Sequence, residues 1–272
     1  MKTLSFAVVV LASLSTTVRA DSPEDRGKAI VQAQIAAVKK WSDNSAMAAT
    51  FAKDAYVLLP NGEQSASDGG IAAAIAFLNP HSTVKEATFD HLTAGGTASV
   101  SWFTADLHFT VTSSGSTEKH VVRAIELLDG AADWKVAVAA FTNVAALSPS
   151  GSCNINDATD PGPLVNLLAA PTSLSAALDA KAVVLGTDPA ERGAGPDAKK
   201  LVDGWKKLHL TLDTAQKARE VHTASYGYAM TNVKLAPSKP GGHAMAMSAF
   251  VLALPGPTGS WSVVAASYGA TF

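Results

Sequence analysis

Apolar and polar positions follow two periods along this chain, and both halves use them in the same order. In the first half, residues 23–41 place apolar side chains at helical spacing, and residues 45–52 favour a second, shorter helix. An apolar run at 56–59 predicts a buried strand, and a polar turn and a third helix over 67–78 follow it. The two-residue alternation beyond them predicts four strands, at about residues 83–92, 97–112, 119–128 and 134–142.

The second half repeats this order. Residues 182–205 align without a gap with residues 55–78, and the strand that begins at Trp134 recurs 127 positions later at Trp261. The repetition of a strand, turn and helix before a run of strands indicates a duplicated domain. In this half we expect a shortened first helix, broken near Pro171, and then the following elements: helices at 164–170, 173–180 and 196–205, and strands at 183–185, 208–212, 219–235, 243–254 and 261–267.

Composition sets the boundaries of the two domains. Residues 146–163 are rich in Ser, Asn, Asp, Gly and Pro and lack periodicity, so they predict a linker between domains at 21–145 and 164–272. Residues 1–20 combine a lysine, an apolar run too short to span a bilayer and a terminal alanine, as a cleavable signal peptide does. We therefore expect a secreted or periplasmic protein, cleaved after Ala20, with no membrane span.

Charge and motifs exclude several classes of function. The formal net charge is −2 and no basic stretch carries interleaved aromatic residues, so nucleic acid is not an expected partner. The chain has no zinc-type His/Cys spacing, phosphate loop or Gly-x-Ser-x-Gly elbow. His243, Met245 and Met247 alternate on one predicted strand, with Met230 on a neighbouring strand, which suits either Cu(I) or core packing. We expect core packing, no metal site and no cofactor.

Helices followed by antiparallel strands indicate an α+β domain, in which a curved sheet wraps around helices on one face. This order, with its closing Trp-x-Val strand, resembles the nuclear transport factor 2-like superfamily, which includes ketosteroid isomerase and the SnoaL-like polyketide cyclases. The segment 186–192, GTDPAER, is similar to a turn of many SnoaL-like proteins. The resemblance implies two tandem cone-shaped domains, each enclosing an apolar pocket. It also implies an intrachain pseudo-dimer, packed through the sheet faces of Trp102 and Tyr228, in a monomeric chain.

Strand parity selects candidate pocket residues. The odd positions of the predicted strand at 97–112 are mostly apolar, so Phe103 and Leu107 are expected to face the pocket of the first cone. The even positions, including Asp106 and His108, are expected on the outer face. Tyr56, in the short opening strand, is a further candidate ligand-binding residue.

Arg123 is the charged candidate in the first cone. It shares its parity with Ile125 and Leu127, so we expect it to project into an apolar interior, where a charge requires a partner. Asp68 is a candidate partner and ligand-binding residue, and Asp54 and Asp90 are alternatives. Arg123 is then either part of an ion pair at the cone mouth or a residue that orients an anionic ligand.

Asp188 is the candidate catalytic base. A ketosteroid isomerase-like mechanism requires a carboxylate base and hydrogen-bond donors that hold an oxyanion. The resemblance implies that the base precedes the proline of the turn, where the first copy has Leu59 and the second has Asp188. The first helix contains no tyrosine to act as donor. The alternative is that Asp188 forms the turn by accepting hydrogen bonds from local amides.

The expected function follows from a pocket rich in apolar residues with few convergent polar groups. We expect an exported protein that binds a small, largely apolar ligand without catalysis. One alternative is an isomerase, cyclase or lyase that acts by proton transfer. Another is a structural or protein-interaction module whose cones are filled by their own side chains.

Overall fold

The computed structural model describes residues 22–39, 45–59, 62–65, 82–144, 155, 158–215, 217–236, 244–256 and 259–270. The expected signal peptide at 1–20 and the expected helix at 67–78 lie outside these residues. No helix in the described ranges is long and apolar enough to cross a membrane.

In its described residues, the first half has two helices beside a six-stranded sheet. The strands lie in the order β2-β1-β6-β5-β4-β3, with β1 parallel to β6 and the other neighbours antiparallel. Its elements are α1 (Pro23–Val38), α2 (Ser45–Ala48), β1 (Phe51–Leu59), β2 (Gly62–Ser65), β3 (Ser82–Gly96), β4 (Val100–Ser113), β5 (Ser116–Asp129), the 3-10 turn Gly130–Ala132 and β6 (Lys135–Asn143).

The second half repeats this plan. Its main path of strands is β10-β11-β12-β13-β7-β8, with β7 parallel to β13 as β1 is to β6, and β9 pairs with β11. Its elements are α4 (Pro163–Leu168), α5 (Pro171–Ala177), β7 (Leu178–Leu185), β8 (Arg192–Ala194), α6 (Pro196–Trp205), β9 (Leu210–Leu212), β10 (Arg219–His222), β11 (Gly227–Leu235), β12 (Met245–Pro255) and β13 (Trp261–Ala270).

Local sequence explains how the two long helices begin. Ser22 caps α1 by accepting a hydrogen bond from the amide of Asp25 at 3.1 Å, and Pro23 occupies a first-turn position where its missing N–H costs nothing. Pro196 likewise occupies a first-turn position of α6. Gly27 lets α1 approach the sheet, because a Cβ there would lie 2.9 Å from Cβ of Phe103.

Three expected elements differ in the structure. The expected helix at 45–52 ends at Ala48, because Phe51 pairs with Val136 of β6 and is buried. The expected helix at 173–180 ends at Ala177, where β7 begins alongside β13. The expected single strand at 219–235 is a hairpin, because the Thr223 hydroxyl accepts hydrogen bonds from the next amides and turns the chain.

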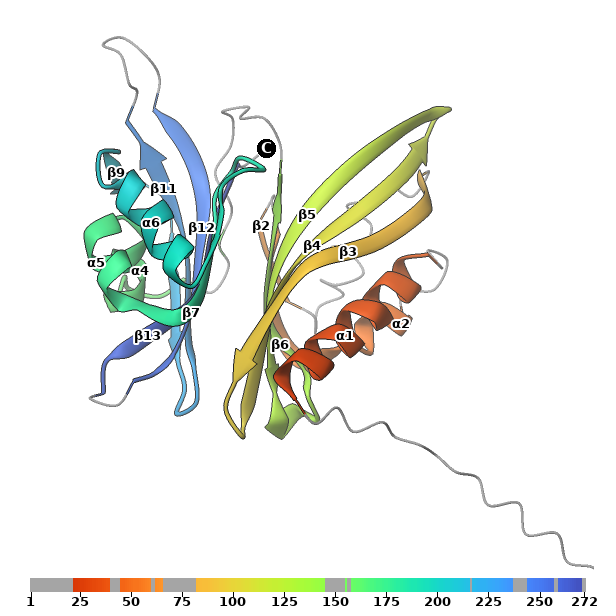
Figure 1. Ribbon diagram of the computed structural model, residues 1–272, viewed down its shortest axis with the longest axis horizontal. Helices are drawn as coiled ribbons and strands as arrows, with labels where there is room; N and C mark the ends of the chain where they lie inside the picture. The colour runs from red at the N-terminus through yellow and green to blue at the C-terminus, as the bar shows by residue number, and fades with distance from the viewer. Residues whose placement is uncertain are drawn as a thin grey trace, which may run out of the picture.

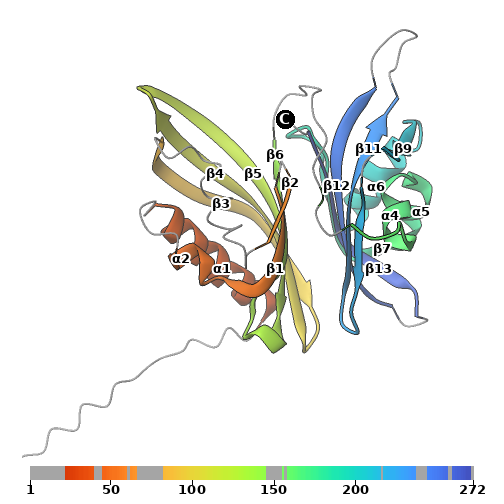
Figure 2. The same cartoon turned by 180° about the vertical axis from the view of Figure 1, so that it is seen from behind.

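Both sheets are covered by helices on one face and by each other on the opposite face (Figure 1, and from behind in Figure 2). We call the helix-covered face of each sheet its inner face. The inner face of each half holds its own apolar cluster. A third cluster contains residues of both sheets, among them Trp102 and Tyr228, and lies between the halves. The expected α+β fold class is therefore confirmed, with the helices on the outside of two facing sheets.

Candidate functional site

Arg123 on β5 joins the two halves. Its side chain is 1% exposed, and its Nη1 donates to the carbonyls of Gly186 at 2.7 Å, Asp188 at 3.0 Å and Glu191 at 3.2 Å. Its Nη2 donates to the carbonyl of Pro189 at 2.7 Å. Four carbonyls of one turn in the second half thus bind a guanidinium from the first half.

The expected projection of Arg123 into the first cone is wrong. Ile125 and Leu127, which share its side of β5, lie in the cluster between the sheets. The two faces of β5 are both apolar because helices cover one and the second sheet covers the other, so parity alone could not assign them. The carboxylate partner is Asp106, the cross-strand neighbour on β4, with its Oδ1 3.8 Å from Nε of Arg123.

A second arginine makes the reverse contact. Arg192 on β8 places Nη1 2.6 Å from Asp106 Oδ1, and its Nη2 donates to the hydroxyl of Thr104 at 3.4 Å and to the carbonyl of His91. Burial lowers the pKa of both arginines, and the nearby Asp106 carboxylate opposes this shift. We call Arg123, Arg192 and Asp106 the arginine clasp, because each half supplies one arginine to the contact.

Asp188 lies in the turn whose carbonyls bind Arg123, and its side chain accepts a hydrogen bond within that turn. Its side chain is exposed, and its Oδ1 accepts a hydrogen bond from the amide of Ala190 at 2.8 Å. The Glu191 carboxylate in turn accepts one from the amide of Asp188 at 3.1 Å. The contacts favour the turn interpretation of Asp188, since an exposed carboxylate bonded to its own turn is not placed to act as a base inside a cone.

The other expected pocket residues divide between the two faces. Phe103 and Leu107 are buried in the inner cluster of the first half, on the expected face. The expectation that Tyr56 lines the pocket is wrong: it faces the second half, where the guanidinium of Arg219 lies 3.7 Å from its ring centroid. Asp68 lies outside the described residues.

A cavity of about 110 Å³ opens on the inner side of the second half. This is several times the ~10–15 Å³ that holds one water molecule. The described residues that line it are Gly186, Thr187, Glu191, Trp205, Leu208, Leu210, Leu235, Met245, Met247 and Tyr268. Most of these side chains are apolar or aromatic, and Glu191 is the charged one among them.

Hydrogen bonds fix the polar end of this cavity. Trp205 directs its indole Nε1 at Oε1 of Glu191, at 3.4 Å, and the Thr187 hydroxyl lies 3.5 Å from Oε2. The rings of Trp205 and Tyr268 pack edge to face with centroids 5.1 Å apart, and the Tyr268 hydroxyl donates to the carbonyl of Leu168 at 2.9 Å. The same turn therefore presents its carboxylate to the cavity and its carbonyls to the arginine clasp.

The methionines do not converge on one site. Met247 lies in the inner cluster of the second half, whereas Met230 lies in the cluster between the sheets. Their side chains are on opposite faces, so they cannot share a Cu(I) ion. Met245 lines the cavity, and His243 lies outside the described residues.

Glu126 is a buried carboxyl that the sequence interpretation missed. It lies on the inner face of β5, is 0% exposed, and its Oε2 accepts a hydrogen bond from Nε2 of Gln34 on α1 at 2.8 Å. Its Oε1 has no hydrogen-bond partner within the described ranges. Burial raises the pKa of Glu126 to about 8, with the bond from Gln34 opposing the rise. The side chain can therefore hold a proton at neutral pH and donate it.

The antiparallel pairing of β4 with β5 would have placed Glu126 on the inner face. Phe103, correctly expected on the inner face, stands directly opposite Glu126, and cross-strand neighbours share a face. The corresponding position of the second half, opposite Ala229, is Val251. Of these two matching positions, only the one in the first half carries a carboxyl group.

The comparisons with known proteins find structural likeness only. No protein-family model matches the sequence, and no curated protein matches it. A ketosteroid isomerase-like protein from Erwinia carotovora atroseptica is 15% identical over 44% of this chain and 94% of its own, with a TM-score of 0.38. An NTF2-like protein from Cytophaga hutchinsonii is 10% identical over 44% of this chain and 97% of its own, with a TM-score of 0.37.

A putative ketosteroid isomerase from Shewanella frigidimarina is 16% identical over 46% of this chain and 98% of its own, with a TM-score of 0.36. Each of these matches spans less than half of the present chain. These three solved structures are described as ketosteroid isomerase-like or NTF2-like proteins.

Proposed function

We propose that this protein binds a small, largely apolar ligand in the cavity of its second half, with the carboxylate of Glu191 as the polar anchor. The supporting observation is the cavity itself, which combines an apolar and aromatic lining with one carboxylate at its polar end. A carboxylate has about four lone-pair directions. Three donors contact Glu191, namely the amide of Asp188, the Thr187 hydroxyl and the Trp205 indole, two of them at 3.4 Å or more. A ligand amine or hydroxyl would donate a further hydrogen bond to the Glu191 carboxylate.

The size of the cavity sets the probe. Cyclohexylamine and cyclohexanol share an apolar ring and differ in the group that meets Glu191. Ligands this small bind on the order of millimolar. We expect both to shift the Trp205 indole resonance in NMR titrations, with the amine binding about tenfold more tightly, because a charge-assisted hydrogen bond is stronger than a neutral one.

Leu208 provides the matched variants. It lines the cavity yet is 40% exposed, so a larger side chain can be introduced there without disturbing the core. Leu208→Trp should weaken binding of cyclohexylamine at least tenfold by covering the mouth, whereas Lys207→Trp, at the adjacent exposed position, should not. Absence of any shift with either probe, or equal weakening by both substitutions, would favour a cone filled by its own side chains.

A second candidate function is proton transfer in the first half, and Glu126 favours it. A general acid works best when its pKa lies near the operating pH. Burial brings the pKa of Glu126 to about 8, and Gln34 fixes the orientation of the group through Oε2. This candidate replaces Asp188 with Glu126 as the residue that would exchange the proton.

A β,γ-unsaturated ketosteroid tests this second candidate, because its conversion to the conjugated isomer is followed directly by ultraviolet absorption. We expect Glu126→Gln to abolish turnover and Asp188→Asn to leave it unchanged. Lack of turnover, or turnover that survives Glu126→Gln, would leave ligand binding as the proposed function.

A further inference from the structure

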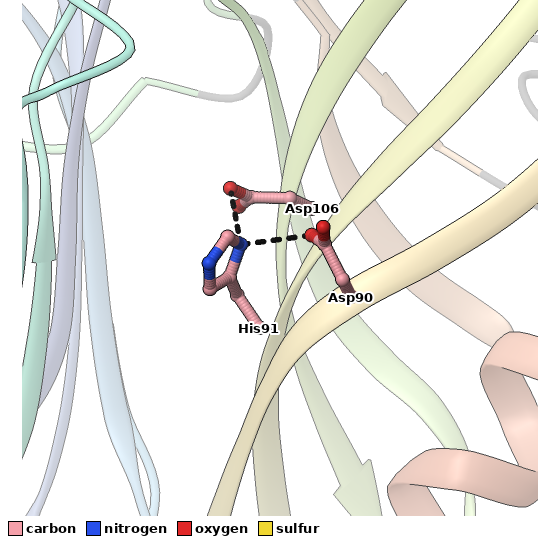
Figure 3. Close-up of side chains that lie close together, drawn as sticks. All are labelled: Asp90, His91 and Asp106. Carbon is pink, nitrogen blue, oxygen red and sulfur yellow. Dashed lines mark ion pairs between the residues drawn. The ribbon is translucent and has the colours of Figure 1, made fainter.

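We infer that Asp90, His91 and Asp106 form a binding site for Zn²⁺ on the side of the first sheet that faces the second half, with water completing the coordination. Figure 3 shows these three side chains, which point toward one another from β3 and β4. The ligand atoms of Asp90, His91 and Asp106 all lie within 4.8 Å of one another. This site is distinct from both the cavity of the second half and the buried Glu126.

The backbone brings these side chains together at an irregularity of β3. Successive residues of a regular strand point to opposite faces, so Asp90 and His91 would normally diverge. The pairing of β3 with β4 shifts register between Asp90 and Thr93, and His91 has φ of +49°. His91 Nδ1 therefore lies 2.8 Å from Asp90 Oδ1, on the same side of the sheet as its neighbour.

Two carboxylates lie beside one imidazole nitrogen in this cluster. Oδ1 of Asp90 is approached by two imidazole nitrogens, His91 Nδ1 at 2.8 Å and His108 Nε2 at 2.9 Å. The single proton that Nδ1 of His91 can carry serves one carboxylate, yet Oδ2 of Asp106 also lies near it, at 3.5 Å. A cation in place of that proton would bind Nδ1 of His91 and an oxygen of each carboxylate together.

The distances suit a small cation. In a tetrahedral zinc site with bonds of ~2.0–2.1 Å, neighbouring ligand atoms lie about 3.3 Å apart. His91 Nδ1 lies 2.8 Å from Asp90 Oδ1 and 3.5 Å from Asp106 Oδ2, so shifts of well under one ångström in these contacts would admit the ion. One imidazole with two carboxylates forms a mixed nitrogen and oxygen set, which favours zinc over the hard cations that prefer oxygen alone.

The surroundings of Asp106 support this assignment. Its side chain is 8% exposed, and its Oδ1 is bound by Arg192 at 2.6 Å, which leaves Oδ2 directed toward His91. Ligating carboxylates are commonly held by an outer hydrogen bond of this kind. His91 is 60% exposed, so an ion can reach the site from solvent.

Calorimetric titration of the purified, chelator-treated full chain with ZnCl₂ tests the proposal, with Co²⁺ as a spectroscopic substitute. We expect one equivalent of Zn²⁺, and visible absorption from Co²⁺ in a four-coordinate site. His91→Ala and Asp90→Asn should each weaken Zn²⁺ binding at least tenfold. His120→Ala removes an exposed histidine of the neighbouring strand β5 and should leave the affinity unchanged.

Circular dichroism of each variant establishes that it is folded before its affinity is compared. Zn²⁺ should also raise the melting temperature of the original protein and of His120→Ala, but not that of His91→Ala. Absence of stoichiometric binding, or an affinity that is unchanged in His91→Ala or Asp90→Asn, would overturn the assignment.

Discussion

Replacing Glu126 with glutamine separates the acid–base property of this buried group from its shape. The side chain is fully buried beneath α1, and its Oε2 accepts a hydrogen bond from Gln34. Glutamine keeps an oxygen acceptor of nearly the same size at this position but cannot ionise. The change therefore removes the cost of placing a negative charge in an apolar interior while preserving the packing between helix and sheet.

The magnitude follows from the pKa. The folded-state pKa of Glu126 is about 8, above the ordinary value of 4.5. A raised pKa means that the stabilising effect of protonation is fully present below pH 4.5 and is lost as the pH rises through about 8. At about 1.4 kcal/mol per pH unit, this interval corresponds to about 5 kcal/mol of unfolding free energy. Glu126→Gln lacks this loss.

Urea unfolding at pH 5, 6, 7 and 8.5 measures the effect. The free energy of unfolding of the variant should exceed that of the original protein by an amount that grows across this range to several kcal/mol. Glu118→Gln, an exposed glutamate near the other end of β5, reports the effect of removing any one such charge. Parallel profiles for Glu126→Gln and the original protein would show that Glu126 ionises freely when folded, which would refute the reasoning.

Two further perturbations test the contacts between and within the halves. Arg123→Met should cost about 3–5 kcal/mol in urea unfolding, because it removes a buried charge that binds four turn carbonyls. The exposed Lys119→Met on the same strand should stay within ~0.5 kcal/mol of the original protein, and an equally small effect of Arg123→Met would contradict the clasp. Gly193→Ala should destabilise the second half by about 1–3 kcal/mol, because its Cβ would lie 2.6 Å from Cα of Ala198. Gly204→Ala should instead stabilise by roughly 0.5–1 kcal/mol, since no described atom lies within 4 Å of the added Cβ and the residue is inside α6. Changes of the same sign in both glycine variants would show that close backbone approach does not decide these positions.

The two halves use one fold but contribute different chemistry. By strand register, Asp106 and Arg123 of the first half correspond to Asn232 and Ser248 of the second, which are also neighbours across two strands. The charged pair therefore exists only in the first half. The second half contacts it through the carbonyls of a turn, which bind Arg123, and through Arg192, which binds Asp106. The contact between the sheets is consequently asymmetric, although the sheets have matching topologies.

The periodic pattern of the sequence was sufficient for the order of the longer strands and of the described helices, but it missed the short strands β2 and β8 and the division between β10 and β11. Strong alternation located β3 to β6 and β11 to β13, because one face of each strand must be buried beneath helices. Pro23 and Pro196 located the starts of two helices through their fixed backbone angle. The internal repeat predicted that both halves share one plan, which the matching parallel pairs β1–β6 and β7–β13 display.

Tertiary structure alone decided which face of each strand is which, and with it the candidate sites. Because the sheets cover each other, β5 is buried on both faces. A two-residue period cannot then tell the face that carries Arg123, between the sheets, from the helix-covered face that carries Glu126. The meeting of Asp90, His91 and Asp106 depends on a register shift in β3 that no alternation signals. The segment 186–192, a turn in the sequence, becomes both a wall of the cavity and the receptor for Arg123 only when the second sheet docks on the first.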